Sequence, residues 1–108
     1  MEVGEIQRQA WQNKLEKGFN TTDVALEFGL LTAELGEAFT AWRRQEADLG
    51  AELADVLIYL ASLAQMTGVD LSAEVERKLV RNARREYSRD ERGVLRRVTD
   101  PAAPAAPA

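Results

Sequence analysis

The 108-residue sequence contains no cysteine and no histidine. The absence of cysteine excludes disulfides, iron–sulfur clusters and cysteine-ligated zinc. The absence of histidine excludes Ser-His-Asp triads, histidine-ligated zinc or haem, and the Glu-x-x-His pairs of di-iron bundles. Any metal held by this chain must be bound through oxygen, and oxygen ligands favour magnesium, manganese or calcium.

Long apolar runs are also lacking. The longest apolar stretch extends from Leu53 to Met66 and is interrupted by Asp55, Ser62 and Gln65. We expect this stretch to be too short and too polar to cross a bilayer. The first residues, MEVGEIQRQAW, are acidic and polar, unlike the basic and apolar regions of a signal peptide. These features predict a cytoplasmic protein with no membrane partner.

Strand signals are scarce, because no run alternates between apolar and polar residues within turn-forming boundaries. Helix formers such as Ala, Leu, Glu, Arg and Gln predominate. The sequence therefore predicts an all-α bundle of four helices within a domain over residues 1–92, with the helices over 2–17, 22–46, 49–67 and 70–90. Residues 93–108 are predicted to be a C-terminal extension with a Pro/Ala-rich end, largely disordered.

Capping residues support three of these helix boundaries. Thr21 or Thr22 is expected to cap the second helix. Gly68 is expected to follow the end of the third helix as a left-handed residue, and Asp70 is expected to cap the fourth.

Helical spacing places most large apolar side chains on one stripe of each central helix. We expect these stripes to be core faces, formed on the second helix by Val24, Phe28, Leu31, Leu35, Ala38, Phe39 and Trp42, and on the third by Leu49, Leu53, Val56, Leu57, Leu60, Leu63 and Ala64. Ala54, Ile58 and Ala61 are apolar but lie off the stripe of the third helix. A helix that is apolar on more than one face needs a second neighbour, which in so small a chain predicts a homo-oligomer.

Two pairs of carboxylates flank the predicted core stripes. Glu34 and Glu37 lie three residues apart on the second helix, and Glu52 and Asp55 on the third, so each pair projects from one side of its helix. An ionised carboxylate near a core is costly unless it is paired or bound to a metal. No Lys or Arg lies between Arg44 and Arg77. The pairs therefore indicate a magnesium site, with ordinary solvated acidic faces as the alternative.

The predicted fourth helix carries cations toward its end. Leu71, Val75, Lys78, Asn82 and Arg85 fall within one narrow arc, and residues 74–97 contain nine basic and five acidic side chains. Lys and Arg donors aimed at one place are typical of phosphate binding. The alternative is a polar helix end whose cations are favoured by the helix dipole. Nucleic-acid binding is disfavoured by the net charge of −4.

The ordered set of motifs resembles a known family. An ExxE pair, the segment ELADVLIYL, then GVDL and KxxxNxxR are similar to those of the MazG-like all-α nucleoside triphosphate pyrophosphohydrolases, over about Trp11 to Tyr87. The segments NKLEKGFN and EAFTAWRR resemble the small single-domain branch of that family.

The resemblance implies a helical bundle that assembles as a dimer or a dimer of dimers. It also implies magnesium-dependent hydrolysis of a nucleoside triphosphate, canonical or not, to the monophosphate and pyrophosphate, with manganese as a substitute ion. By resemblance, the metal ligands are Glu34, Glu37, Glu52 and Asp55. Glu34 or Glu37 would in addition orient the attacking water as the catalytic residue.

The remaining motif residues are assigned to the substrate. By resemblance, Lys78, Asn82 and Arg85 contact the phosphates or the sugar. The base is expected against Asn13, Lys14 and Asn20, with Trp11 and Phe19 as aromatic candidates. The chain departs from many relatives before the first motif, where Leu31-Thr32-Ala33 lacks a further glutamate and Glu27 lies a turn or more away. The number of bound metals is therefore left open.

Two other functions stay open at this point. A phosphoribosyl-ATP pyrophosphohydrolase would use the same chemistry on a larger substrate, and the KGFN and AWRR segments disfavour it by resemblance alone. A catalytically silent helical interaction module would leave the acids solvated, and the complete set of acids and cations disfavours it.

Overall fold

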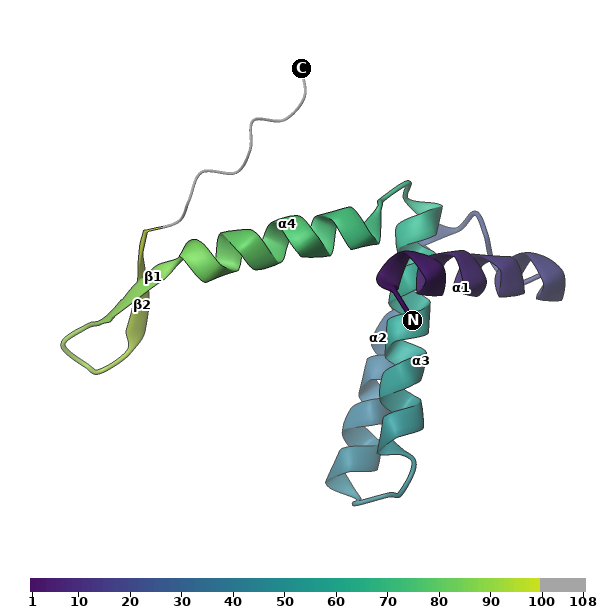
Figure 1. The fold of residues 1–108 in the computed structure, drawn as a ribbon. Coiled ribbons are helices and arrows are strands. Elements are labelled where there is room, and N and C mark those ends of the chain that lie inside the picture. Colours follow the sequence, from purple (N-terminus) through teal and green to yellow (C-terminus); the bar gives the residue numbers. More distant parts are fainter. Residues whose placement is uncertain (100–108) are drawn as a thin grey trace. The chain divides into compact units, whose positions relative to one another are not determined.

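The computed structural model describes residues 1–99 and forms two compact units, Met1–Ser72 and a second that begins at Ala73. The elements, drawn in Figure 1, are α1 (Val3–Lys17), α2 (Val24–Arg43), α3 (Leu49–Met66), α4 (Leu71–Arg84), β1 (Glu86–Arg89) and β2 (Leu95–Thr99). All four predicted helices are present, so the mostly helical fold class is confirmed.

The first unit is built on the antiparallel pair of α2 and α3, and α1 packs against α3 (Figure 1). Asp23 begins α2, and its Oδ1 accepts a hydrogen bond from the Leu26 N–H at 3.0 Å. The predicted caps Thr21 and Thr22 are therefore wrong, since the carboxylate lies directly before the first helical residue. Gly68 follows the end of α3 with a φ of 73°, as predicted.

A buried glutamine fastens α1 to the end of α3. Gln7 donates from Nε2 to Gln65 Oε1 at 2.9 Å and to the Val69 carbonyl at 2.8 Å. Its Oε1 accepts from the Leu71 N–H at 3.1 Å. Every hydrogen-bonding group of this amide except one lone pair is thus used to hold α1 in place.

The buried interior of the described residues is made of small side chains. Its apolar members are Ala10, Ala38, Ala41, Ala61, Leu63 and Ala64. The alanines let the helix backbones approach closely, but they remove little apolar area from water. The largest fully buried side chain is that of Glu27, which is polar.

The predicted core stripes are for the most part exposed within one chain, so the prediction is wrong for the single chain. On α2, more than half of the side-chain surface is open at Phe28, Leu35, Phe39 and Trp42, and on α3 a large share is open at Leu53, Leu57 and Leu60. The face of α2 that is covered instead carries Glu27, Ala38 and Ala41. Helical periodicity finds an apolar face, but it does not say whether the same chain covers it.

The helix α3 satisfies, by length and composition alone, the requirements for crossing a membrane. This differs from our expectation, because the helix begins at Leu49 and is longer than the apolar run counted from Leu53. Core helices of soluble proteins pass the same test. The helix also carries Glu52 and Asp55 and packs against both α1 and α2.

The second unit differs from the prediction, because α4 ends at Arg84 and a β-hairpin follows. Strands β1 and β2 pair antiparallel, with Tyr87 opposite Arg97 and Arg89 opposite Leu95. Asp90 Oδ1 accepts from the Arg92 and Val94 N–H groups at 2.9 Å each, which closes the turn.

The hairpin corrects the predicted helix boundary at residue 90, and it spans the predicted domain boundary at residue 93. Residues 93–99 form part of the turn and all of β2, and the compact units divide before Ala73. Gly93, with a φ of 77°, supplies the left-handed residue that the turn requires. Two short strands rich in charge gave no alternating pattern to detect. The predicted disorder of residues 100–108 lies outside the described residues.

Candidate metal centre and adjoining cavity

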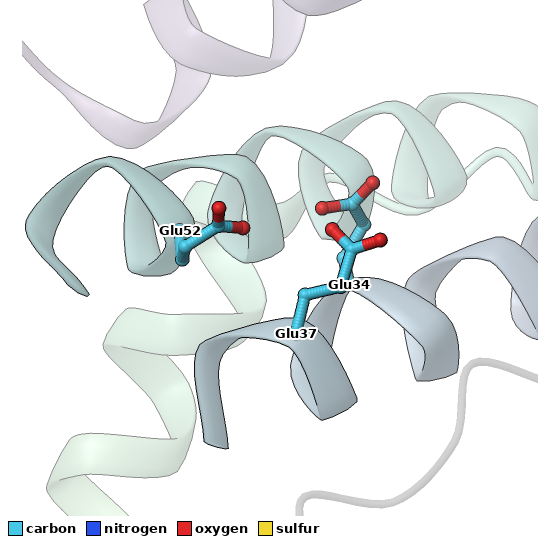
Figure 2. A group of neighbouring side chains, drawn as sticks. All are labelled: Glu34, Glu37 and Glu52. Carbon is cyan, nitrogen blue, oxygen red and sulfur yellow. The ribbon is translucent and has the colours of Figure 1, made fainter. Parts of the chain in front are cut away.

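Three of the four predicted metal ligands come together between α2 and α3. Glu34 and Glu37 project from one side of α2, and Glu52 projects from the first turn of α3 (Figure 2). One carboxylate oxygen from each residue lies within 4.8 Å of the others. The antiparallel pairing of the two helices therefore brings acids from separate motifs to one place.

Two oxygens of this cluster are buried and lack a hydrogen-bond partner among the described residues: Oε2 of Glu34 and Oε2 of Glu52. Burial raises the pKa of Glu34, and the negative charge of Glu37 raises it further. The pKa of Glu52 is also raised, first by burial and then by Asp48. Buried, unpartnered carboxylate oxygens that repel one another fit a divalent cation, and an all-oxygen set suits Mg²⁺ or Mn²⁺.

Asp55 lies one turn after Glu52 but is not part of the three-carboxylate cluster. Its side chain is exposed, and its negative charge contributes to the raised pKa values of Glu34 and Glu52. The same residue lines a cavity, whereas the three clustered acids are not among its lining residues. Its assignment as a metal ligand therefore stays a prediction.

The cavity lined by Asp55 has a volume of about 380 Å³, within the range of small-ligand sites. It is lined by Ala10, Asn13, Lys14, Phe19, Asn20, Glu27, Leu30, Asp55, Ile58, Tyr59 and Ser62. All three residues predicted to contact the base line it, as does Phe19, whereas Trp11 is not among its lining residues.

Ile58 and Tyr59 add an apolar and an aromatic side chain to this cavity. Ile58 lines the cavity and is 44% exposed in the single chain. Its predicted place in a subunit contact or a second apolar layer stays a prediction. Tyr59 was missed by the sequence analysis. Its position four residues after Asp55 places both side chains on one side of α3, which was the available signal. Burial and the charge of Glu34 raise the pKa of Tyr59.

A buried polar network forms the wall of the cavity between α1 and α2. Lys14 Nζ donates to Glu27 Oε1 at 2.5 Å and to the Asn20 carbonyl at 2.8 Å. Asn20 Nδ2 donates to Glu27 Oε2 at 3.1 Å. Glu27 is 0% exposed and Lys14 is 7% exposed, so the ion pair lies out of water. The sequence analysis gave Glu27 no role, because charge pairing across a loop leaves no fixed spacing.

The predicted phosphate-binding residues belong to the second unit. Lys78 and Asn82 are exposed on α4, and Arg85 follows the last residue of that helix and is partly buried. The Arg85 N–H donates to the Asn82 carbonyl at 3.2 Å, which continues the helical turn. Their role toward a substrate stays a prediction.

Comparison with known proteins identifies the family. The profile of the MazG-like family matches residues 25–100, which include both acidic motifs and α4. The chain therefore belongs to the MazG-like family, as the ordered motifs predicted.

Individual relatives agree with this assignment. A dATP/dGTP diphosphohydrolase of cyanophage S-2L is 32% identical over 77 residues, which are 71% of this chain and 70% of the relative. A dATP/dGTP diphosphohydrolase of Salmonella phage PMBT28 is 34% identical over 73 residues. That match covers 61% of this chain but only 25% of the relative, so the chain spans a quarter of that protein's length.

A solved structure resembles the fold over nearly the whole chain. It is the cyanophage S-2L MazG-like pyrophosphohydrolase bound to dGDP and three catalytic Mn²⁺ ions per active site. The TM-score is 0.65 at 28% identity, with 92% of this chain and 95% of that chain covered.

Proposed function

We propose that the chain is a metal-dependent nucleoside triphosphate pyrophosphohydrolase that converts a deoxynucleoside or nucleoside triphosphate to its monophosphate and pyrophosphate. The observation that carries this proposal is the cluster of Glu34, Glu37 and Glu52, with two buried oxygens that lack partners among the described residues. The enzyme class of the two named relatives supports the proposal.

We assign separate roles in phosphoanhydride hydrolysis to different residues of the chain. Glu34, Glu37, Glu52 and Asp55 would hold the cation. A bound Mg²⁺ or Mn²⁺ would supply charge neutralisation for the phosphate oxygens. A carboxylate oxygen of Glu34 or Glu37 that is left free by the cation accepts a hydrogen bond from water and orients it. In the second unit, Lys78 and Arg85 offer cationic donors for phosphate oxygens, and Asn82 offers an amide donor for a phosphate or the sugar.

The adjoining cavity is the proposed site of the nucleoside. Asp55 belongs to the second acidic motif and also lines the cavity, so the cavity opens beside the metal ligands. Phe19 and Tyr59 provide aromatic surface, and Asn13 and Lys14 provide polar groups. Relatives named for dATP and dGTP, and a neighbour that holds dGDP, favour purine deoxynucleotides as substrates.

We further propose that the enzyme works as a homodimer or homotetramer. The apolar stripe, defined as Phe28, Leu35, Phe39 and Trp42 of α2 with Leu53, Leu57 and Leu60 of α3, is exposed in the single chain. An exposed apolar surface of this kind on a small chain with a mainly alanine interior marks a contact with another chain. A second copy offers the same stripe in return.

A substrate screen tests the proposed function. Canonical and modified nucleoside triphosphates are incubated with the protein and Mg²⁺ or Mn²⁺, and pyrophosphate release is measured. We expect release from at least one deoxynucleoside triphosphate, abolished by a chelator. The absence of turnover of any triphosphate would favour the silent interaction module, and turnover in a chelator would contradict the proposed metal dependence.

A further inference from the structure

The hydrogen-bonding capacity of Asn20, in the network beside the cavity, is fully used within the chain. Asn20 Nδ2 donates to the Asp23 carbonyl at 2.7 Å and to Glu27 Oε2 at 3.1 Å. Asn20 Oδ1 accepts from the Asp23 N–H at 2.9 Å and the Thr22 N–H at 3.4 Å. An amide has two donors and two lone pairs, so no position of Asn20 is left for a ligand.

Each carboxylate oxygen of Glu27 accepts from a different donor within the chain. Oε1 accepts from Lys14 and Oε2 accepts from Asn20. Its side chain is completely buried. Because this side chain is completely buried, Glu27 neutralises and orients Lys14 and exposes no surface to a ligand.

Lys14 retains one unused donor. Its ammonium has three N–H groups, and the described residues accept two of them, at Glu27 Oε1 and at the Asn20 carbonyl. The side chain is 9% exposed and lines the cavity. A buried cation that is already neutralised and keeps a single donor at a cavity wall is suited to a neutral hydrogen-bond acceptor.

The same network fixes the loop that follows α1. The Lys14 carbonyl accepts from the Phe19 N–H at 3.0 Å, and its ammonium holds the Asn20 carbonyl. Phe19, which is 57% exposed and lines the cavity, is thus positioned from both sides by contacts to Lys14. The same hydrogen bonds therefore fix the position of the Lys14 ammonium and of the Phe19 ring.

We propose that Lys14 is the specificity-determining donor for the nucleobase, and that Glu27 and Asn20 are positioning residues that act through it. This inference rests on the proposed function for the identity of the ligand. A donor-only group favours the O6 and N7 acceptors of guanine, whereas adenine places an amino donor at the same edge. The network thus selects a guanine base over an adenine base and leaves the metal chemistry unchanged.

The test compares guanine and adenine nucleotides on matched variants. The double variant Lys14→Met/Glu27→Met removes the ion pair without leaving a buried charge. Glu27→Gln keeps the volume and the lysine but removes the neutralising charge. Lys17→Met, at an exposed lysine of the same helix, is the control.

For the wild type, we expect kcat/KM for dGTP to exceed that for dATP by about tenfold, the effect of one good donor–acceptor contact. In the double variant the ratio falls to near one because KM for dGTP rises, while kcat stays within about threefold. Glu27→Gln raises KM for dGTP by an intermediate factor, and Lys17→Met changes neither constant. A folded double variant that keeps the guanine preference, or a wild type without one, would overturn the inference.

Equilibrium binding separates this inference from the proposed function. Calorimetry with dGDP and dADP in the presence of Mn²⁺ measures the same preference without turnover. A wild type that prefers dGDP but hydrolyses no triphosphate supports the inference and contradicts the proposed function. A wild type that hydrolyses dGTP and dATP but binds dGDP and dADP with equal affinity supports the proposed function and contradicts the inference.

Discussion

At the scale of single residues, the candidate site contains one buried carboxylate that is paired with a cation and others that are not. Glu27 is completely buried and has Lys14 as its counter-charge. Glu34 and Glu52 have buried oxygens that lack partners among the described residues, and acids surround both side chains. The charge in the first arrangement is neutralised within the chain, whereas the second is suited to the proposed cation.

The first prediction concerns the free energy of unfolding without metal. The pKa of Glu34 is raised above its ordinary value of 4.5, so the folded chain holds this proton more tightly than the unfolded chain. The penalty for ionising Glu34 is absent below pH 4.5 and fully present above the raised pKa. Glu34→Gln should therefore raise the melting temperature at neutral pH in a chelator.

The measurement is thermal unfolding in chelator between about pH 4 and about pH 8. The Glu34→Gln variant should lose stability less steeply than the wild type as the pH rises. Glu16→Gln, at an exposed glutamate of α1, is the control and should leave the wild-type profile unchanged. A lower melting temperature for Glu34→Gln throughout this range would show that Glu34 has a stabilising partner instead.

The second prediction addresses Asp55, which lies outside the three-carboxylate cluster. Because Asp55 is proposed as a metal ligand, the variant Asp55→Asn should lower kcat/KM by about 100-fold or more. The fold should stay intact. The exposed side chain of Asp55 makes a large loss of stability unexpected. Full metal-dependent activity of this variant would remove Asp55 from the site.

At the scale of elements, the pairing of α2 and α3 determines the site. Ala38 and Ala41 are 3% and 2% exposed and lie on the covered face of α2, one and two turns beyond Glu34. Small side chains at these positions keep the two helices close enough for Glu52 to meet Glu34 and Glu37. The metal centre therefore depends on residues that have no polar atoms of their own.

The third prediction tests this spacing. Ala38→Leu inserts volume into the covered face and should lower the free energy of unfolding by about 1–3 kcal/mol. It should also weaken Mn²⁺ binding, because it displaces the α2 carboxylates from Glu52. Ala25→Leu, at an exposed position of α2, is the control for folding and binding by calorimetry. Unchanged Mn²⁺ affinity in Ala38→Leu would mean that the cluster tolerates a different helix separation.

The sequence predicted the elements unequally, for physical reasons. Helix formers and the glycine at position 68 predicted the helices well, since both act locally. The hairpin was not predicted, because it depends on pairing between strands, such as Tyr87 with Arg97 and Arg89 with Leu95. Such pairing leaves no pattern within one short segment of sequence. The acidic motifs were found from their spacing, whereas the Lys14–Glu27 pair joins residues across a loop and needed the structure.

At the scale of the whole molecule, the exposed apolar stripe is the observation that supports the proposed assembly. Trp42 is 62% exposed and stacks against Phe39 with ring centroids 6.1 Å apart, so two aromatic rings stand open to solvent. Covering this surface in an assembly would provide the apolar burial that the alanine-rich interior lacks.

The fourth prediction is that the 12.0-kDa chain sediments as a dimer or tetramer at micromolar concentration. Phe39→Glu places a charge in the stripe and should shift the protein toward the monomer with a lower melting temperature. Leu15→Glu, at a similarly exposed apolar residue of α1, should leave the assembly unchanged. A wild type that sediments as a monomer would contradict the proposed assembly.

The central claim is that the carboxylates between α2 and α3 form the metal site of a pyrophosphohydrolase. The most direct test is the rate of pyrophosphate release from dGTP with Mn²⁺, for the wild type and for Glu34→Gln, Glu37→Gln and Glu52→Gln. We predict metal-dependent release by the wild type and a loss of about 100-fold or more in each folded variant. Wild-type rates in all three variants, or release by the wild type in a chelator, would contradict the account.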